Sequence, residues 1–444
     1  RKFWWGFLQH FLHRLDHLLS RLDRPIPLVA LSATLGEINS VPPLLRPNGR
    51  LPCDIVTTMQ SSSEVKVQVR GYLNPEKGVE EGRLSAKDQI ARDVFELCRG
   101  GSHLVFANSR GRTEELASKL SQMCEEQVVP NEFFPHHGSL AKELRESLET
   151  RLQQERLPTT AVCTMTLELG IDIGKVNSVV QVTSPHSVSS LRQRMGRSGR
   201  RGGAAVLRAL IAEPELTVRS DLGDKLRLEL VQTLAILRLL IASRWFEPAD
   251  TRLYHFSTLF HQVLAVIAQW GGIRADQLYE LLCRTGPFNK VSTSQFMQLL
   301  KNMGSGEFLT QISSGELVLG VEGEKMVNHY SFYAVFKTPE EFRLVSGSKT
   351  LGTVPVDYPL MTGQHIIFGG RYWLVDDIDG DKKLIRVSPS KGGVPPQFGG
   401  EGMGVQKKVR QEMLTMYLEQ DYRIPVGDRK IDYIDPVARS LFDE

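Results

Sequence analysis

Between residues 103 and 211 the chain alternates short apolar runs with longer segments of helical periodicity. The segment 139–152, for example, places a leucine at every fourth position, which is the repeat of one helix face. The apolar runs predict strands at HLVFA (103–107), FFPHHG (133–138), TTAVC (159–163), NSVVQV (177–182) and AAVLRALI (204–211). Strands that alternate with helices of this length form βαβ units, so the predicted fold class is α/β with a parallel sheet. The loops 108–112, 164–174 and 193–201 should then lie along one edge of that sheet.

The segments before and after this block carry other patterns. A helical repeat covers residues 3–22, and the apolar run 28–31 predicts a buried parallel strand. The alternating run 64–72 predicts a further strand, and residues 222–243 predict one long helix. The run 64–72 begins a second block, which a connector rich in proline, glycine and asparagine over 42–50 separates from the run 28–31.

The chain beyond residue 250 divides into two further patterns. Three helical segments at 257–270, 274–285 and 293–303 precede a hairpin around Ser313–Gly315. Three helices and a hairpin are the plan of a winged helix. From about residue 325 short strands are separated by turn residues, which predicts a small β-rich domain closed by a helix over 405–417.

Composition and charge exclude several classes of protein. The 444 residues include 54 basic and 51 acidic side chains, a net charge of +3, so nucleic-acid affinity must come from local basic patches. The five cysteines include no CxxC pair, which argues against a disulfide framework or a structural zinc site. Neither a transmembrane run nor a signal peptide is evident, so we expect a cytoplasmic protein without a membrane partner.

Five arginines are crowded into one short stretch, LRQRMGRSGRRGG. They are Arg192, Arg194, Arg197, Arg200 and Arg201. Gly196 and Gly199 allow a turn that brings several guanidinium groups onto one small target. A basic run alone is typical of a solvated surface or a nucleic-acid patch. This run has fixed glycine spacing and follows a predicted strand, which favours a phosphate as its target.

Motifs III, IV, IVa, V and VI of superfamily 2 helicases resemble, in this order, LVALSATLG, VFANSRGRTEELA, FPHHGSL, TMTLELGIDIGKVNSVVQV and QRMGRSGRRGG. The segments HHGSL, TLELGIDIG and SPHSVSSLRQRMGRSGR most resemble the large helicase-related (Lhr) branch of the DEAD/DEAH-box helicases. The similarity runs from residue 28 to about 420. It implies an ATP-dependent helicase or translocase on single-stranded or partly duplex nucleic acid, with DNA favoured over RNA and 3′ to 5′ polarity.

The resemblance also implies a domain organisation. We expect a RecA-like parallel-sheet domain followed by a winged-helix domain and a small β-rich domain. The predicted boundaries are 1–55 for a remnant of a first RecA-like domain with motif III, 56–220 for the second RecA-like domain with motifs IV to VI, 221–250 for a connecting helix, 251–322 for the winged helix, and 323–444 for the β-rich domain with its C-terminal helix.

Motif VI implies the catalytic residues. ATP hydrolysis builds negative charge on the γ-phosphoryl group, and arginine supplies a planar, permanently charged group that can neutralise it. By resemblance, Arg197 and Arg200 are the arginine fingers, and Gln193 and Arg194 support them. The two outer arginines of the stretch are either part of this group or surface charge.

Motifs V and III imply contacts with the nucleotide and a route for coupling. Gly170 and Asp172 would face ATP, with Asp172 accepting from a ribose hydroxyl; the alternative is a carboxylate that caps a helix. Ser32, Ala33 and Thr34 would relay the nucleotide state to the surface that binds the strand; the alternative is a turn capped by hydroxyl groups.

Motifs IV, IVa and V imply contacts with nucleic acid. The implied residues are Asn108, Ser109 and Arg110, then His137 and Gly138, then Thr164 and Thr166. Short polar groups at strand ends suit backbone phosphates, a contact that positions a strand without reading its sequence. Two further contacts stay open. The winged helix is either a DNA wedge or packing, and Phe368, Tyr372 and Trp373 beside Arg371 either stack on bases or form a core.

Two motifs of a complete ATPase are missing from the 444 residues. The sequence contains no GxxxxGK[ST] loop and no DExH box, and Ser346–Thr350 resembles only the end of the first. The resemblance implies ATP and Mg²⁺ as cofactors. We expect the magnesium ligands to lie in a first RecA-like domain, which belongs to the same or another polypeptide. We expect no metal site within the 444 residues themselves. Alone, the chain is not expected to hydrolyse ATP.

Two other classes of function remain open. One is a non-catalytic nucleic-acid-binding subunit that keeps half of the helicase fold and pairs with a separate ATPase chain. The other is a transcription-factor-like binder that uses the winged helix, which leaves motifs III to VI unexplained.

Overall fold

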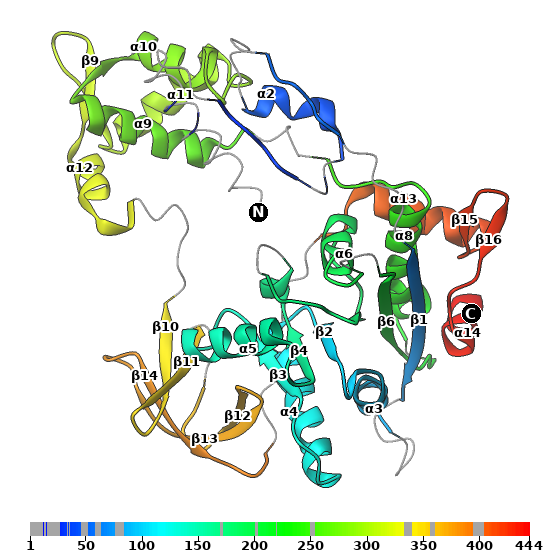
Figure 1. Ribbon diagram of the computed structural model, residues 1–444. Coiled ribbons are helices and arrows are strands. Elements are labelled where there is room, and N and C mark those ends of the chain that lie inside the picture. Colours follow the sequence, from blue (N-terminus) through cyan, green and yellow to red (C-terminus); the bar gives the residue numbers. More distant parts are fainter. Residues whose placement is uncertain are drawn as a thin grey trace. The chain divides into compact units, whose positions relative to one another are not determined.

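The computed structural model describes Leu12, Leu15 and residues 27–32, 34, 36–45, 52–57, 64–75, 84–168, 172–199, 203–218, 220–248, 254–332, 340–355, 360–393 and 404–444. The chain divides into two compact units (Figure 1). One contains residues 1–58 and 248–338, and the other contains residues 59–247 and 339–444. The predicted helix over 3–22 lies almost entirely outside the described residues.

The second unit is built on a wholly parallel six-stranded sheet in the order β1-β6-β5-β2-β4-β3 (Figure 1). Its strands are β1 (Val65–Asn74), β2 (Ser102–Phe106), β3 (Phe133–His136), β4 (Thr159–Cys163), β5 (Ser178–Val182) and β6 (Ala205–Pro214). Strands β4 and β5 are buried along their whole length, as expected for apolar strands covered on both faces. The predicted α/β class and parallel sheet are confirmed.

Within the described ranges, four helices connect the strands, and short hydroxyl side chains cap three of them. They are α3 (Ala86–Cys98), α4 (Arg110–Glu126), α5 (Lys142–Gln154) and α6 (Val188–Met195). The side chains of Ser85, Ser109 and Ser187 accept hydrogen bonds from the first turns of α3, α4 and α6. Helix α5 begins later than its leucine repeat predicts, because Leu140 pairs as a β-bridge with Gly352 of another sheet.

The long helix predicted over 222–243 is interrupted. It consists of α7 (Leu222–Lys225) and α8 (Leu228–Ile241), separated at Arg227, whose φ of 45° is left-handed. The Arg227 side chain is buried, donates to the Pro214 carbonyl and pairs with Glu444. These tertiary contacts hold a left-handed backbone conformation that costs residues other than glycine roughly 1 kcal/mol. Local periodicity cannot reveal this break in the helix, because the contacts come from distant parts of the chain.

Helix α8 is apolar around most of its circumference and therefore needs cover on two sides. It packs on β6 and on α13 (Lys407–Glu419), a helix from the end of the chain. The chain then forms the hairpin β15 (Ile424–Val426) and β16 (Arg429–Ile431) and the last helix α14 (Pro436–Asp443). Residues 404–444 thus share the core of the parallel sheet, whereas the sequence grouped them with the β-rich domain.

The C-terminal segment also extends the open edge of the parallel sheet. The Val69 amide donates to the Tyr433 carbonyl over 2.9 Å, and the Asp435 amide donates to the Val69 carbonyl over 2.9 Å. Gly71 lies so close to α14 that an added Cβ would stand 2.6 Å from the Ala438 amide nitrogen. Edge strands expose unpaired backbone groups, and here the last part of the chain pairs with them.

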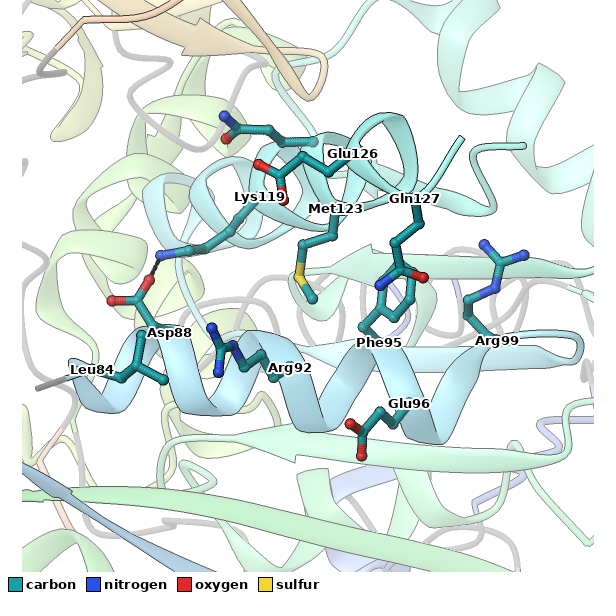
Figure 2. A pocket seen from close by; sticks show the side chains of 11 residues that line it. Leu84, Asp88, Arg92, Phe95, Glu96, Arg99, Lys119, Met123, Glu126 and Gln127 are labelled. Carbon is teal, nitrogen blue, oxygen red and sulfur yellow. Dashed lines mark ion pairs between the residues drawn. The ribbon is translucent and has the colours of Figure 1, made fainter. Parts of the chain in front are cut away.

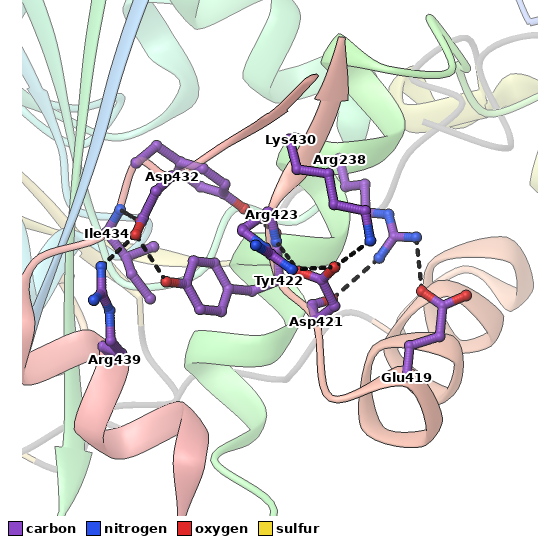
Figure 3. A network of polar contacts seen from close by, with 10 residues as sticks. Arg238, Glu419, Asp421, Tyr422, Arg423, Lys430, Asp432, Ile434 and Arg439 are labelled. Carbon is purple, nitrogen blue, oxygen red and sulfur yellow. Dashed lines mark hydrogen bonds and ion pairs between the residues drawn. The ribbon is translucent and has the colours of Figure 1, made fainter. Parts of the chain in front are cut away.

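A polar network fastens the same segment (Figure 3). The Asp421 carboxylate accepts from Arg423 over 2.8 Å and from Lys430 over 2.5 Å, and these hydrogen bonds, Arg423 first, hold the pKa of Asp421 well below its usual range. Arg238 of α8 donates to the Asp421 carbonyl over 3.2 Å and pairs with Glu419 over 3.0 Å. The network therefore joins α8 to the chain end.

The second sheet of this unit has five strands in the order β11-β10-β14-β13-β12. They are β10 (Glu341–Ser346), β11 (Lys349–Pro355), β12 (His365–Phe368), β13 (Arg371–Asp379) and β14 (Leu384–Pro389). Phe368 and Trp373 are buried in its core, Tyr372 is half-buried and Arg371 is exposed. The core interpretation therefore holds for Phe368 and Trp373, and base stacking by these two is excluded.

The predicted helices after residue 250 are present in the first unit. They are α9 (Phe256–Trp270), α10 (Ala275–Tyr279) continued by a π-helical turn (Glu280–Arg284), and α11 (Thr293–Ser305). The strands β7 (Ile273–Arg274), β8 (Leu309–Gln311) and β9 (Glu316–Leu319) pair in the order β7-β9-β8, and α12 (Val321–Asn328) follows. The helices and hairpin lie at the predicted positions, and the winged-helix assignment stays a prediction.

The N-terminal part of the first unit departs from its prediction. It contains a 3-10 turn (Ile38–Ser40) and the short helix α2 (Pro42–Leu45). The predicted buried strand over 28–31 is wrong, since these residues form no strand and Val29 and Leu31 are 82% and 93% exposed. A parallel strand requires neighbours to pair with, and the described part of the chain provides none for this run.

Candidate functional site

A buried arginine joins motifs IV, V and VI. Arg194, on α6, is fully buried, and its Nε lies 3.1 Å from Glu168 Oε2. Its Nη1 donates to Asn108 Oδ1 over 2.9 Å and to Gln181 Oε1 over 2.6 Å. The guanidinium carbon lies 4.7 Å from the centroid of the Phe106 ring. Arg194 therefore holds the carboxyl ends of β2 and β5 and the loop after β4 in one arrangement.

The second arginine of motif VI is fixed by the same loop. Arg197 is 6% exposed, and its Nε and Nη2 donate to the Glu168 carbonyl over 3.2 and 3.0 Å. Gly199 has a φ of 73°, and an added Cβ would stand 2.7 Å from the Ala205 amide nitrogen, so glycine is required there. Gln193 is half-buried on α6, and Arg200 lies outside the described residues.

The motif IV residues have unequal exposure. Asn108 adopts a φ of 60°, and its amide donates to Thr183 Oγ1 over 2.9 Å and to the Ser184 carbonyl over 2.7 Å. The Ser109 hydroxyl caps α4 by accepting from the Arg112 amide. Arg110 is exposed in the first turn of α4. Asn108 and Ser109 therefore have structural partners, while Arg110 faces solvent.

Motifs IVa and V meet at a buried histidine. His136 Nδ1 lies 2.8 Å from Thr166 Oγ1, and His136 Nε2 lies 2.9 Å from Glu149 Oε1. The His136 carbonyl accepts from the Thr164 amide and from the Thr166 hydroxyl, both over 3.2 Å. Burial lowers the pKa of His136, and Glu149 opposes that shift. The loops after β3 and β4 are thereby joined.

The next residue, His137, is also buried. Its Nε2 donates to Glu114 Oε1 over 2.7 Å, so its side chain faces the protein rather than solvent. Gly138 is exposed, and nothing lies within 4 Å of the position its Cβ would take. Of the two residues predicted to touch nucleic acid here, only Gly138 is accessible in this structure.

Among the other predicted residues, three are described by the structure. Asp172 is exposed; its carbonyl accepts from Gln153 over 2.7 Å and its Oδ1 accepts from the Gly174 amide over 3.4 Å. Ser32 and Thr34 belong to the other compact unit, where Ser32 Oγ accepts from the Thr34 amide over 3.3 Å. Gly170 and Ala33 lie outside the described residues.

Two carboxylates that organise the site were not predicted from the sequence. Glu168 and Glu114 are 1% and 4% exposed, and each holds a residue that the motifs did predict. The signal for Glu168 was an acidic residue in the apolar stretch TMTLELGI, since such a residue seldom becomes buried without a cationic partner. No local pattern marked Glu114, which lies on a helix among other charged residues.

An open groove of about 620 Å³ lies elsewhere, between α3 and α4 (Figure 2). Phe95 and Met123 line it together with charged side chains, and Asp88 pairs with Lys119 across it. None of the residues predicted for ATP or nucleic acid lines this groove. It is therefore separate from the candidate site.

Other kinds of site receive no support in the described part of the chain. Among these residues, no three His, Cys, Asp or Glu side chains gather in a way that could hold a metal ion. The five cysteines are free thiols, four of them buried. No described helix is long and apolar enough to cross a membrane.

Glu213 is an unpredicted buried acid at the end of β6. Its Oε1 accepts from the Leu230 amide over 2.7 Å in the first turn of α8, and the side chain is 3% exposed. Burial raises the pKa of Glu213 to about 7, against the hydrogen bond from Leu230, which lowers it. The folded pKa thus exceeds the ordinary value, so folding favours the protonated carboxyl.

We expect the unfolding free energy to depend on this group. The stabilisation from protonated Glu213 is complete below about pH 4.5 and is lost as the pH rises through about 7. Glu213→Gln stays neutral, so the wild type should lose roughly 2–3 kcal/mol more than the variant between pH 4.5 and 8. Urea unfolding at a series of pH values measures this difference, and parallel curves for the two proteins would contradict the assignment.

Comparison with known proteins agrees with this geometry. Residues 86–202 match the helicase conserved C-terminal domain. The chain is 25% identical over 426 residues to the ATP-dependent helicase Lhr-Core of Methanocaldococcus jannaschii, which covers 90% of this chain and 47% of that protein. It is 25% identical over 449 residues to the Lhr helicase/uracil glycosylase of Escherichia coli, which covers 88% of this chain and 28% of that protein.

The solved structure of Mycobacterium smegmatis helicase Lhr bound to ssDNA and AMP-PNP is similar with a TM-score of 0.60 at 25% identity, over 76% of this chain and 42% of that one. The chain is thus similar to the Lhr helicases over most of its length. The DUF1998 helicase MrfA bound to DNA and AMPPNP has a TM-score of 0.61 at 18% identity, over 87% of this chain and 50% of that one, and shows the fold alone. The Lhr-like chain spans less than half the length of the two curated relatives above.

Proposed function

We propose that this Lhr-like chain is the part of an ATP-dependent helicase or translocase that supplies the arginine-finger side of the ATPase cleft. Its substrate would be single-stranded or partly duplex nucleic acid, DNA rather than RNA, with 3′ to 5′ movement. The relatives named as ATP-dependent helicases support the general activity. The solved Lhr helicase bound to ssDNA supports nucleic acid as the ligand.

The arrangement around Glu168 carries the proposal. The Glu168 side chain holds Arg194, and its carbonyl holds Arg197, the first proposed finger. Transition-state stabilisation depends on charged groups that are already oriented before the reaction begins. Because the Nε and Nη2 of Arg197 both donate to one carbonyl, the orientation of its guanidinium is restricted. We propose that Arg197 and Arg200 act on the γ-phosphate of ATP bound by a first RecA-like domain, with Gln193 and Arg194 in support.

The same proposal assigns the other groups. Asp172 and Gly170 would face the nucleotide, and Ser32 to Thr34 would couple its state to the bound strand. ATP and Mg²⁺ are the proposed cofactors, and the described residues do not gather the acidic ligands that a magnesium ion prefers. We propose that a first RecA-like domain supplies the magnesium ligands. The winged-helix and β-rich domains are part of the same proposal.

The exposed groups nearby would grip the nucleic-acid backbone. Arg110 opens α4, where backbone amides favour anions, and Gly138 offers its main chain at the tip of the loop after β3. Thr164 and Thr166, both half-buried, follow β4 at the same edge. His137 and Asn108 are held by internal partners, so we assign them to shaping these loops.

A second candidate is also compatible with the 444 residues, which contain neither GxxxxGK[ST] nor DExH. In this alternative the chain is a non-catalytic binding subunit that pairs with a separate ATPase chain. Reading the coding sequence upstream of Arg1 separates the two. An in-frame GxxxxGK[ST] loop followed by DExH supports the enzyme, and a genuine start codon at this point supports the subunit.

Binding and turnover test the proposed function directly. The 444-residue chain should bind a fluorescent oligothymidylate with an affinity that falls as salt rises, because phosphate contacts release counterions. It should show no ATP turnover alone, and strand-dependent turnover when the ATP-binding half is present. A chain that does not bind the oligonucleotide under any salt condition would contradict both candidates.

A further inference from the structure

Glu114 of α4 uses both carboxylate oxygens to join two sheets. Its Oε1 accepts from the Gly369 amide over 2.8 Å and from His137 Nε2 over 2.7 Å, and its Oε2 accepts from the Gly370 amide over 2.7 Å. Gly369 and Gly370 form the turn between β12 and β13, and His137 follows β3 of the parallel sheet. One buried side chain therefore connects the five-stranded sheet to the loop of motif IVa.

The turn is shaped to receive this carboxylate. Gly369 and Gly370 have φ values of 65° and 72°, a left-handed pair that favours glycine in two-residue hairpin turns. Such a turn leaves two successive amides without partners inside the hairpin, and successive amides attract anions. Because Glu114 is only 4% exposed, these contacts replace the water that it loses on burial.

The loop of motif IVa is held on its other side by the same small sheet. The Thr353 amide donates to the Ser139 carbonyl over 2.8 Å, and the Ala141 amide donates to the Leu351 carbonyl over 2.9 Å. Leu140 is buried in the core of the five-stranded sheet. Gly138 is thus the exposed residue of a loop whose neighbours on both sides are fixed by β11 and by Glu114.

We propose that Glu114 is a positioning residue, through which the five-stranded sheet fixes the loop 137–140 for contact with the nucleic-acid backbone. This inference rests on the proposed function, because it assigns a purpose to the way that function's binding loop is held. The five-stranded sheet then influences the binding of nucleic acid indirectly, by holding this loop. Its buried aromatic side chains make no contact with the nucleic acid in this proposal. Two backbone amides and the His137 imidazole donate to the Glu114 carboxylate. Hydrogen bonds to a carboxylate are stronger than hydrogen bonds between two neutral groups.

The test compares Glu114→Gln with Glu115→Gln in the 444-residue chain. The first change leaves one acceptor for three donors and points an amide NH₂ at a backbone N–H. The control changes the adjacent residue of the same helix, which is half-buried and pairs instead with Lys87 over 2.8 Å. Gly369→Ala is a second route to the same contact, since a left-handed φ strains alanine while Glu114 stays intact.

Two readouts separate positioning from simple stabilisation. The first is amide exchange over 137–141 and 369–370, with and without an oligothymidylate, and the second is the oligothymidylate dissociation constant. Glu114→Gln and Gly369→Ala should speed exchange at these amides on the order of tenfold. They should also weaken oligothymidylate binding about 5- to 10-fold, as expected for the loss of one or two positioned hydrogen bonds. The oligonucleotide should protect residues 137–141 in Glu115→Gln as in the wild type, and should no longer do so in the two test variants.

Each other outcome has a definite meaning. Faster exchange with unchanged affinity would show a structural contact only and overturn the proposal, as would unchanged exchange in both test variants. If a variant unfolds, amide exchange in the wild type still tests the proposal. An oligothymidylate that binds the wild type without protecting the amides of residues 137–141 would overturn it. Failure of the wild type to bind at all contradicts the proposed function, and the exchange rates without oligonucleotide still report whether Glu114 holds the loop.

Discussion

Arg200→Ala should lower ATP turnover by about 10³–10⁵ in an intact protein that contains the ATP-binding half, because an arginine finger is worth that factor in related NTPases. The guanidinium neutralises charge that develops on the γ-phosphoryl group only as the bond breaks. Removing it should therefore affect the maximal rate and leave oligothymidylate binding within a few-fold. Initial rates of phosphate release at saturating ATP and oligonucleotide measure the first effect, and fluorescence anisotropy measures the second.

Two further variants sharpen this result. Arg200→Lys keeps a positive charge but loses the planar fork, and we expect most of the loss to remain. Arg92→Ala removes the same charge from an exposed arginine of α3, which lines the groove between α3 and α4, and should leave turnover near the wild-type rate. Near-normal turnover by Arg200→Ala would end the finger assignment, whatever the effect on binding.

Glu168→Ala should destabilise the fold by about 3–5 kcal/mol, the usual cost of removing one partner of a buried ion pair. Both side chains of the Arg194–Glu168 pair are fully buried, so Arg194 would keep its charge without a compensating anion. The Ser190 hydroxyl, which donates to Glu168 Oε2 over 2.6 Å, would lose its acceptor as well. Urea unfolding followed by far-UV circular dichroism measures the change.

A surface pair provides the control for Glu168. Glu146→Ala breaks an exposed pair with Lys142 at 3.6 Å and should cost no more than about 0.5 kcal/mol. A double-mutant cycle with Arg194→Ala isolates the interaction, since the second substitution should cost far less once the first is made. Independent, additive effects of the two substitutions would show that the pair does not organise this loop.

The strands of the parallel sheet could be predicted because their signal is local. An apolar run such as 159–163, bounded by turn residues, needs only its own neighbours to become a strand that is buried on both faces. The same reasoning placed motifs IV and V at the ends of β2 and β4. It failed at residues 28–31, where the run is equally apolar but the described part of the chain contains no strand to pair with it.

The site residues show the same division. The arginines of motif VI could be found from their spacing and from resemblance, but their surroundings could not. Arg197 faces a carbonyl because the loop after β4 folds back onto the end of α6. Asn108 supports Arg194 because the chain just after β2 lies beside the same helix. Neither contact leaves a pattern within a few residues, since the partners lie 29 and 86 positions apart.

The parallel sheet, the order of the motifs and the resemblance to the Lhr helicases could be predicted from the sequence, because apolar periodicity, helix caps and motif spacing act over a few residues. The pairing of residues 404–444 with the edge of that sheet, and the binding of Glu114 to a turn 255 residues further along the chain, became visible only in the folded structure. Such contacts depend on chain segments that meet only after folding, and a hydrogen bond between them requires nothing more than one carboxylate and two amides in the correct place. Carboxylates and glycines are common in any sequence, so their pairing becomes visible only when the fold brings them together.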